Sequence, residues 1–393
     1  MKQLVHKMKQ IIEQAFFQQF QNQPDIILSC GGRFEVLGNH TDHNHGLCIA
    51  ATCSLSIYGA FKKRCDSLIN LHSEGYQDIT LDLKSLNIIE EEKGSTASLI
   101  RGINAYLSND YQIGGFDAYI KSEIPNGAGV SSSAAFELLI AQAVNYLFNK
   151  KQIPLMTLCK AGQYAERTYY GKMCGLLDQI GVAYGGLVYM DFKHTDNPYV
   201  EPLLLDLKDY QFLIVNTGGS HAALSHLYTA IPDDMKKVAH FFNKEYLREI
   251  DLNDLQNNKE QIETQYNKDI YLRALHFFNE NQRVESAYNA IKNKDIDSLI
   301  NLMNESRVSS TNYLKNMFVE SEKDSPLEAC NLILKSSNNK AGVKINGGGF
   351  AGSVIALLPR DEINSVVKAC TEKYGKENVH LVAIRNDVPC LLK

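Results

Sequence analysis

Residues 125–135 constrain this chain more than any other part of its sequence. They read Pro-Asn-Gly-Ala-Gly-Val-Ser-Ser-Ser-Ala-Ala and lie between an expected strand, 116–120, and an expected helix, 134–148. Glycines allow positive φ and close backbone approach, and the first N–H groups of a helix lack intrahelical partners and attract anions. The loop therefore favours phosphate binding, although a serine cluster that only caps the helix is the structural alternative. The candidate phosphate ligands are Gly127, Gly129, Ser131, Ser132 and Ser133.

The common nucleotide-binding signatures are missing or incomplete. The sequence has no G-x-x-x-x-G-K-[ST] loop and no H-R-D or D-F-G motif. Residues 347–352, Gly-Gly-Gly-Phe-Ala-Gly, match G-x-G-x-x-G, but an expected strand, 353–358, follows them where a dinucleotide site needs a helix. We interpret this run as a second glycine-rich turn against the first loop or a nucleotide, with Gly348 and Gly349 as candidate contacts. An ordinary hairpin turn is the alternative.

Residues 32–46 place one arginine, one aspartate and three histidines between two apolar segments. A carboxylate, an amide and imidazoles together can match several hydroxyl donors and acceptors, so the segment suits a hydroxyl-rich ligand. A metal centre is the second interpretation, because histidine and aspartate are also metal ligands, although the spacing fits no established pattern. Its candidate ligands are His40, Asp42, His43 and His45.

Two acidic residues are notable in the segment 165–181. Glu166 ends an expected helix, 156–170, whereas Asp178 is surrounded by leucine, isoleucine and valine. A carboxylate in an apolar setting needs a partner, and Arg33 is the natural candidate. Asp178 is therefore a candidate functional acid, and a helix cap or a core ion pair is the structural alternative.

Composition limits the class of protein. The 393 residues include 40 Lys and Arg against 45 Asp and Glu, a net charge of −5, which argues against nucleic acid as the main partner. Strands and helices occur in both halves, so we expect an α+β protein with domains at 1–205 and 206–393. Nine scattered cysteines favour a reduced, cytoplasmic protein. Residues 1–23 suggest an amphipathic helix, with neither a signal peptide nor a membrane span.

In this order, the four segments resemble the motifs of the GHMP small-molecule kinases, and within that superfamily those of the galactokinases. The segment 32–46 is similar to G-R-x-N-x-I-G-E-H-T-D-Y-x-x-G, and the serine loop is similar to P-x-G-x-G-L-S-S-S-A. Residues 174–179, Cys-Gly-Leu-Leu-Asp-Gln, resemble C-G-x-M-D-Q, and 347–352 resemble G-G-G-F-G-G. The four motifs extend over most of the chain.

The resemblance implies a two-domain GHMP kinase fold with the active site in the cleft between domains. It implies an ATP-dependent sugar-1-kinase that phosphorylates the anomeric hydroxyl of galactose and acts as a monomer or weak dimer. ATP would lie along the serine loop, with Mg²⁺ near Ser132, Ser133 and Glu166. Asp178 would be the catalytic aspartate, with Arg33 beside it. The residues expected to contact the sugar are Asn39, His40, Asp42, Gly175, Asp178 and Tyr228.

The segment 32–46 also departs from the galactokinase pattern. Asn39 replaces a glutamate that the family uses at the C6 end of the sugar, Glu35 replaces an asparagine, and His43 replaces a tyrosine. Because a neutral amide would not repel a carboxylate, a C6-modified sugar such as galacturonate is an alternative substrate. A non-catalytic sensor of galactose and ATP on the same fold, and a metal hydrolase built on His40 to His45, are the other hypotheses.

Overall fold

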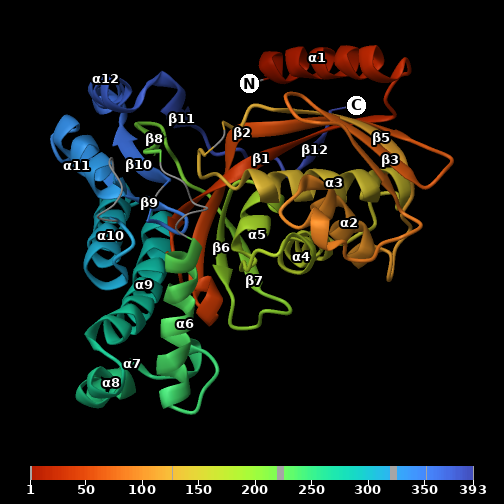
Figure 1. Ribbon diagram of the computed structural model, residues 1–393. Coiled ribbons are helices and arrows are strands. Elements are labelled where there is room, and N and C mark those ends of the chain that lie inside the picture. The colour runs from red at the N-terminus through yellow and green to blue at the C-terminus, as the bar shows by residue number, and fades with distance from the viewer. Residues whose placement is uncertain (1, 126, 219–224, 319–324, 351, 393) are drawn as a thin grey trace.

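The computed structural model describes residues 2–125, 127–218, 225–318, 325–350 and 352–392. Two sheets organise the molecule, a large one from the first half of the chain and a small one from the second half (Figure 1). Periodic apolar residues among polar ones also predict solvated helices over about 233–323. The end of this stretch, 319–323, lies outside the described residues, as do Asn126 of the serine loop, Ala351 of the glycine run and Met1 of the expected N-terminal helix.

The large sheet has eight strands in the order β12-β1-β2-β5-β3-β4, with β6 beside β2 and β7 beside β6. Neighbouring strands are antiparallel, except that β3 and β5 are parallel. The central strands β1 and β2 are buried along nearly their whole length, whereas β3 and β5 alternate buried and partly exposed residues. Their bounds are β1 Ile26–Leu37, β2 Leu47–Lys63, β3 Leu68–Ser73, β4 Ile79–Asp82, β5 Phe116–Ser122, β6 Leu187–Asp191, β7 Tyr199–Leu203 and β12 Cys390–Leu391.

Helices cover both faces of the large sheet (Figure 1). Helix α1, Lys2–Phe20, lies on one face, where Met8, Ile12 and Phe16 repeat at helical spacing and pack against Ile27 and Tyr58. The other face carries the main core and four helices: α2 Thr96–Leu107, α3 Ser132–Phe148, α4 Leu155–Tyr164 and α5 Leu177–Ala183.

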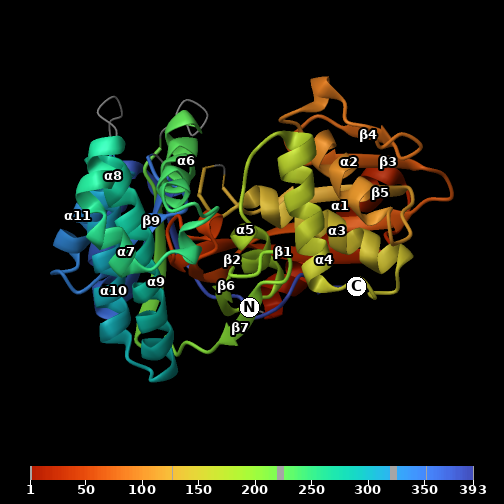
Figure 2. The ribbon, with the colours of Figure 1, turned by 90° about the horizontal axis from the view of Figure 1, so that it is seen from below.

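The small sheet is antiparallel in the order β11-β8-β10-β9. Its core is a separate cluster that includes Leu213, Val354 and Ile333. Figure 2 shows this part and its helices on one side of the molecule and the large sheet on the other. The strands are β8 Tyr210–Asn216, β9 Gly342–Asn346, β10 Ser353–Pro359 and β11 Val379–Val382, and the covering helices are α11 Pro326–Ser336 and α12 Ile363–Tyr374.

Four further helices form a third cluster, around Met235, Phe277 and Leu314. They are α6 Ser225–Phe241, α7 Leu252–Asn257, α8 Lys259–Gln265 and α9 Lys268–Lys292. Helix α9 is the longest of them and contacts both α6 and strand β2 of the large sheet. Helix α10, Ile296–Ser309, packs against α9 and β9, and its buried residues belong to the main core. Short 3-10 helices occur at Asp42–Asn44, Glu90–Glu92, Leu247–Glu249, Arg360–Glu362 and Lys376–Asn378, and π-helical turns at Ala165–Tyr170 and Ser310–Leu314.

The C-terminal segment returns to the large sheet. Strand β12 pairs with β1, and the backbone N–H of Leu392 donates to the carbonyl of Ile27. The Arg385 guanidinium donates to the hydroxyls of Ser29 (2.7 Å) and Ser56 (2.8 Å) on the first two strands. The last residues therefore pack with the first half of the chain, and a division at residue 205 stays a prediction.

The expected α+β class is confirmed, and three expected elements have different limits. The short apolar run 26–28 predicts a strand of three residues, but β1 runs to Leu37, so that the first part of the polar segment 32–46 is strand. The expected helix 156–170 is α-helical only to Tyr164 and continues as a π-helical turn. The stretch 336–352 is rich in turn residues, but strand β9, Gly342–Asn346, lies inside it. Among the described helices, none has the length and apolar character needed to cross a membrane.

Candidate active site

A cavity of about 860 Å³ lies between the two halves of the chain. From the first half it is lined by the end of β1, the serine loop before α3 and the segment 170–178. From the second half it is lined by the start of α6 and by the glycine turn between β9 and β10. Motifs up to 300 residues apart in the sequence therefore share one cavity.

The serine loop is held by hydrogen bonds at the N-terminus of helix α3. Ser131 has a left-handed φ of 52°, and Gly127 and Gly129 have φ values of 76° and 69°. A Cβ on Gly129 would lie 2.0 Å from the hydroxyl of Ser353, so glycine is required there. The Gly129 carbonyl accepts hydrogen bonds from Arg33 Nη1 (2.9 Å) and from Asn346 Nδ2 (3.0 Å). Both halves thus hold the loop that presents the first N–H groups of α3 to the cavity.

Asp178 is the centre of a buried charge cluster. Its Oδ1 accepts from Arg33 Nε and Nη2, each at 2.7 Å, and its Oδ2 accepts from the Ser131 hydroxyl at 2.5 Å. The predicted ion pair with Arg33 is therefore confirmed. Burial alone would raise the pKa of Asp178, but the charges of Arg33 and Lys172 outweigh it, so the pKa is lowered. Asp178 is an ionised carboxylate with 24% of its side chain exposed.

Glu166 lies behind the serine loop, on the π-helical turn, and is 1% exposed. Its Oε1 accepts from the Ser133 hydroxyl (3.2 Å) and from Lys172 Nζ (2.7 Å). Its Oε2 accepts from Gln179 Nε2 (3.3 Å), which also donates to Glu137 (2.9 Å). Burial, and next the charge of Glu166, raise the pKa of Glu137 well above 4.5. The raised pKa favours the protonated, neutral form of Glu137 beside Glu166.

Ser132 and Ser133 line the cavity at the serine loop, and the Glu166 carboxylate lies behind Ser133. Mg²⁺ prefers oxygen ligands and is usually held by one or two carboxylates together with substrate phosphates and water. The donor chemistry of these residues therefore fits Mg²⁺. Within the described ranges, no group of three or more His, Cys, Asp or Glu side chains is arranged to hold a metal ion.

The end of the cavity opposite the serine loop is lined by His40, Asp42, His43 and Tyr228. The Gly348 carbonyl accepts from His40 Nε2 (2.8 Å), so that His40 Nδ1 is left to accept from His43 Nε2 (3.3 Å). Burial, and next the charge of His43, lower the pKa of His40 well below 6.5, so this ring is neutral. The His40 and Tyr228 ring centroids are 5.1 Å apart. His45 instead stacks on Tyr246 outside this group, with centroids 3.6 Å apart.

Gly175 lies directly against Asp42. A Cβ on this residue would be 1.8 Å from Asp42 Oδ2, so only glycine leaves the carboxylate in place. Asp42 Oδ1 accepts from the backbone N–H of His43 (3.0 Å). The segment before α5 and the segment after β1 are therefore fitted to each other at this end of the cavity.

Asn39 borders the cavity, but its side chain is 1% exposed and bound by the protein. Its amide nitrogen donates to the Gly347 carbonyl (2.7 Å) and to Glu35 Oε1 (3.4 Å). Its amide oxygen accepts from Asn316 Nδ2 (2.9 Å) and the Ser310 hydroxyl (3.4 Å). Both amide hydrogens are thus engaged, which removes the basis for expecting Asn39 to bind a substrate carboxylate.

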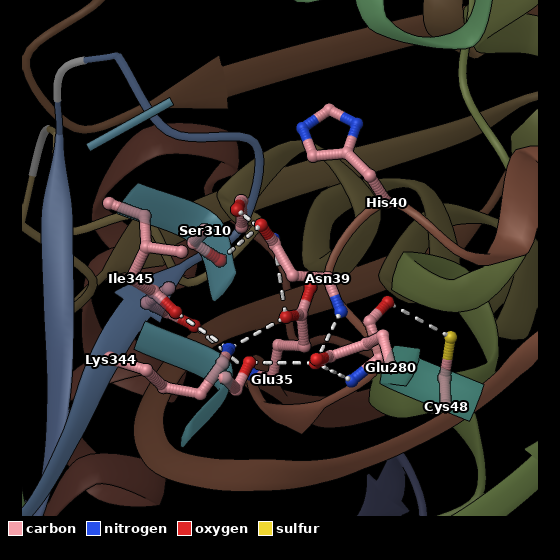
Figure 3. Close-up of polar contacts among 12 residues, drawn as sticks. Glu35, Asn39, His40, Cys48, Glu280, Ser310, Lys344 and Ile345 are labelled. Atoms are coloured by element: carbon pink, nitrogen blue, oxygen red, sulfur yellow. Dashed lines mark hydrogen bonds and ion pairs between the residues drawn. The ribbon is translucent and has the colours of Figure 1, made fainter. Parts of the chain in front are cut away.

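A buried polar network fixes the backbone that leads into this end of the cavity (Figure 3). Glu280 Oε1 on α9 accepts from the backbone N–H groups of Gly38 (3.1 Å) and Asn39 (3.3 Å). Its Oε2 accepts from Arg283 Nε (2.7 Å). Lys344 on β9, which is fully buried, forms an ion pair of 2.7 Å with Glu35. The second half of the chain thus provides the hydrogen bonds that hold residues 35–39.

The structure brings nearly all the sequence-predicted site residues together. Glu166 and His45 do not line the cavity itself: the Ser133 hydroxyl donates to Glu166 from the cavity side, and His45 stacks on Tyr246. Sequence reasoning missed Glu280, Lys344 and Lys172, because charged residues in helices or loops usually indicate a solvated surface. The predicted residues that line the cavity are Arg33, Asn39, His40, Asp42, Gly127, Gly129, Ser131, Ser132, Ser133, Gly175, Asp178, Tyr228, Gly348 and Gly349.

Two family models match the chain. The model of the GHMP kinases N terminal domain matches residues 98–186, which include the serine loop and Asp178. The galactokinase galactose-binding signature matches residues 14–63, which include Arg33, His40 and Asp42. The chain therefore contains a GHMP kinase N-terminal domain and a galactokinase galactose-binding signature.

Curated relatives and solved structures agree with this assignment. A galactokinase of Clostridium tetani is 28% identical over 354 residues, covering 88% of this chain and 87% of the relative. A galactokinase of Streptococcus mutans is 29% identical over 385 residues, covering 93% and 94%. The structure of Lactococcus lactis galactokinase complexed with galactose has a TM-score of 0.83 at 23% identity, with 96% and 98% covered. The Methanococcus jannaschii mevalonate kinase has a TM-score of 0.65 at 17% identity, with 92% and 98% covered. This kinase therefore has the GHMP fold.

Glu280 predicts a specific dependence of stability on pH. Burial would raise its pKa, but Arg283, His276 and Lys344 lower it from 4.5 to about 2. A carboxylate with a lowered folded-state pKa stabilises the protein above the unfolded value of 4.5, and this stabilisation is lost as the pH falls toward 2. The full shift corresponds to about 3 kcal/mol, of which about 2 kcal/mol is lost between pH 7 and pH 3.

Urea unfolding of wild type and Glu280→Gln at several pH values measures this contribution. The difference in unfolding free energy between them should shrink by about 2 kcal/mol from pH 7 to pH 3. Glu285→Gln, which changes an exposed glutamate of the same helix, is the matched control and should track wild type. A difference between wild type and Glu280→Gln that stayed constant with pH would contradict the assigned pKa.

Proposed function

We propose that this kinase is a galactokinase, which transfers the γ-phosphoryl group of ATP to the anomeric hydroxyl of galactose. The observation that carries the proposal is the shared cavity, in which residues of the galactose-binding signature face Asp178 and the serine loop. The galactokinases among its relatives, which align over most of the chain, support the same substrate. The intact cluster of Arg33, Asp178 and Ser131 favours an enzyme over a non-catalytic sensor.

The positions of the serine loop and Asp178 determine where ATP and the sugar would bind in the cavity. ATP phosphates at the N-terminus of α3 would accept from its free N–H groups, and the sugar would lie between Asp178 and His40. The C1 oxygen forms a bond to the γ-phosphorus while the bond to the β,γ-bridging oxygen breaks and ADP leaves. Asp178 accepts the proton of the C1 hydroxyl. Because Arg33 keeps Asp178 ionised, it can orient this hydroxyl before the proton moves.

Mg²⁺ would be held by Ser132, Ser133 and Glu166 together with phosphate oxygens. It would neutralise the charge that develops on the transferring phosphoryl group. At the sugar end, Asp42, neutral His40 and Tyr228 provide an acceptor, an imidazole and a hydroxyl for the sugar hydroxyls. Galactose is the proposed substrate rather than a C6 acid, because the Asn39 amide is engaged by the protein.

We extend the proposal to a cytoplasmic enzyme that works as a monomer or weak dimer. No disulfide joins the eight cysteines whose side chains the structure describes, as expected in a reducing compartment. Every group assigned to the sugar or to ATP comes from one chain, so a single copy can provide the whole site.

The direct test is release of ADP from Mg²⁺-ATP in the presence of a panel of monosaccharides. Galactose should give the largest kcat/KM, with galacturonate and glucose at least tenfold lower, because a site built to pair with each hydroxyl discriminates against analogues. A panel in which no sugar released ADP above background would end the proposal.

Replacing the catalytic carboxylate should remove most of the turnover. Asp178→Asn keeps the shape of the side chain but cannot accept the hydroxyl proton, so kcat should fall about 10²- to 10⁴-fold. Asp191→Asn is the matched control, because Asp191 is also paired with an arginine, Arg248, and is also 24% exposed, but lies outside the cavity. Asp178→Asn with wild-type kcat would rule out the mechanism.

Adding a methyl group at Gly175 should weaken the binding of galactose but not that of ATP. In Gly175→Ala, the new Cβ would displace the Asp42 carboxylate, which would lie 1.8 Å away. The loss of a charge-assisted hydrogen bond corresponds to a KM for galactose that is about ten- to hundredfold higher. Affinity for ATP, measured by titration calorimetry, should stay at the wild-type value. Equal losses for galactose and ATP would indicate general misfolding instead.

A further inference from the structure

Lys172 is a charged residue that lines the cavity but lies outside the four sequence motifs. It lies between the π-helical turn and α5, in the stretch that links Glu166 to Asp178. Its side chain is 52% exposed, and its Nζ donates to Glu166 Oε1 at 2.7 Å. Because the same oxygen accepts from the hydroxyl of Ser133, the ammonium lies beside the start of α3. Lys172 is therefore on the phosphate side of the cavity.

Arg33 is poorly placed to bind phosphate, although it is the other permanent cation among the described residues that line the cavity. Its Nε and Nη2 are bound to Asp178, and its Nη1 is bound to the Gly129 carbonyl. Its side chain is 7% exposed. The Arg33 guanidinium is thus occupied in holding Asp178 and the serine loop.

Lys172 has the free capacity that Arg33 lacks. An ammonium has three hydrogen-bond donors, and the bond to Glu166 uses one of them. The ion pair of 2.7 Å with Glu166 leaves the ammonium at the edge of the cavity, where about half of the side chain is exposed. A half-exposed ammonium beside the N-terminus of a helix is suited to a phosphate oxygen.

We propose that Lys172 is a phosphate-binding residue, whose ammonium contacts the terminal phosphates of ATP while Glu166 anchors it. This inference rests on the proposed function, because it needs ATP on the serine loop. Lys172 then shares with Mg²⁺ the neutralisation of the phosphates, while Arg33 serves Asp178. The two cations of the cavity have different tasks, one toward the nucleotide and one toward the catalytic carboxylate.

The test is the dissociation constant of ATP, measured by titration calorimetry with Mg²⁺ and again with EDTA. Lys172→Met keeps the length of the side chain but removes the charge, and it should raise the dissociation constant for Mg²⁺-ATP about ten- to hundredfold. The increase should be larger with EDTA, because Mg²⁺ no longer shares the phosphate charge. Lys172→Arg should bind more tightly than Lys172→Met, and AMP, which lacks the terminal phosphates, should bind all proteins equally.

Lys292→Met is the matched control. Lys292 is 48% exposed and paired with Glu201 outside the cavity, so its replacement should leave ATP binding unchanged. Lys172→Met with wild-type affinity for Mg²⁺-ATP would overturn the inference, as would equal losses for ATP and AMP, which indicate a merely structural role. Failure of the wild-type protein to bind ATP at all would instead contradict the proposed function.

Discussion

The arrangement of the active site depends on the charge cluster at Asp178. Its carboxylate accepts hydrogen bonds from Arg33 on β1, which is 145 positions away in sequence, and from Ser131 at the N-terminus of α3, which is 47 positions away. A buried charge that loses its partner costs several kcal/mol, so β1, α3 and α5 are tied to one relative position. The same contacts place the proposed base beside the loop proposed for phosphate binding.

A second set of buried charges joins the two halves of the chain. Glu35 pairs with Lys344, and the backbone after β1 donates to Glu280 (Figure 3). Compared with the galactokinase pattern, positions 35 and 39 have exchanged an asparagine and a glutamate. The structure puts these two side chains 3.4 Å apart, so the exchange keeps one amide and one carboxylate in the same contact. The carboxylate, however, now lies next to a buried lysine.

Local sequence patterns were sufficient where the chemistry is local. The serine loop, the glycine turn and Asp178 stand out by local pattern, and all three line one cavity. The pairing of Asp178 with Arg33 follows from the cost of an unpaired carboxylate. Long-range pairing was not predictable from one sequence. Nothing near Glu280 or Lys344 distinguishes them from solvated charges, and the burial of Asn39 depends on Asn316 and Gly347, about 300 residues away. The length of β1 was missed for the same reason, because its partner strand decides where it ends.

The central claim is that the cavity directs the C1 hydroxyl of galactose toward the γ-phosphorus of ATP. Phosphorus NMR of the product formed from galactose labelled with ¹³C at C1 tests it most directly. The account predicts a phosphate-ester signal that is split by the labelled carbon, because the new bond joins phosphorus to the oxygen on C1. An ester signal without this splitting would place the phosphate on another hydroxyl and contradict the account.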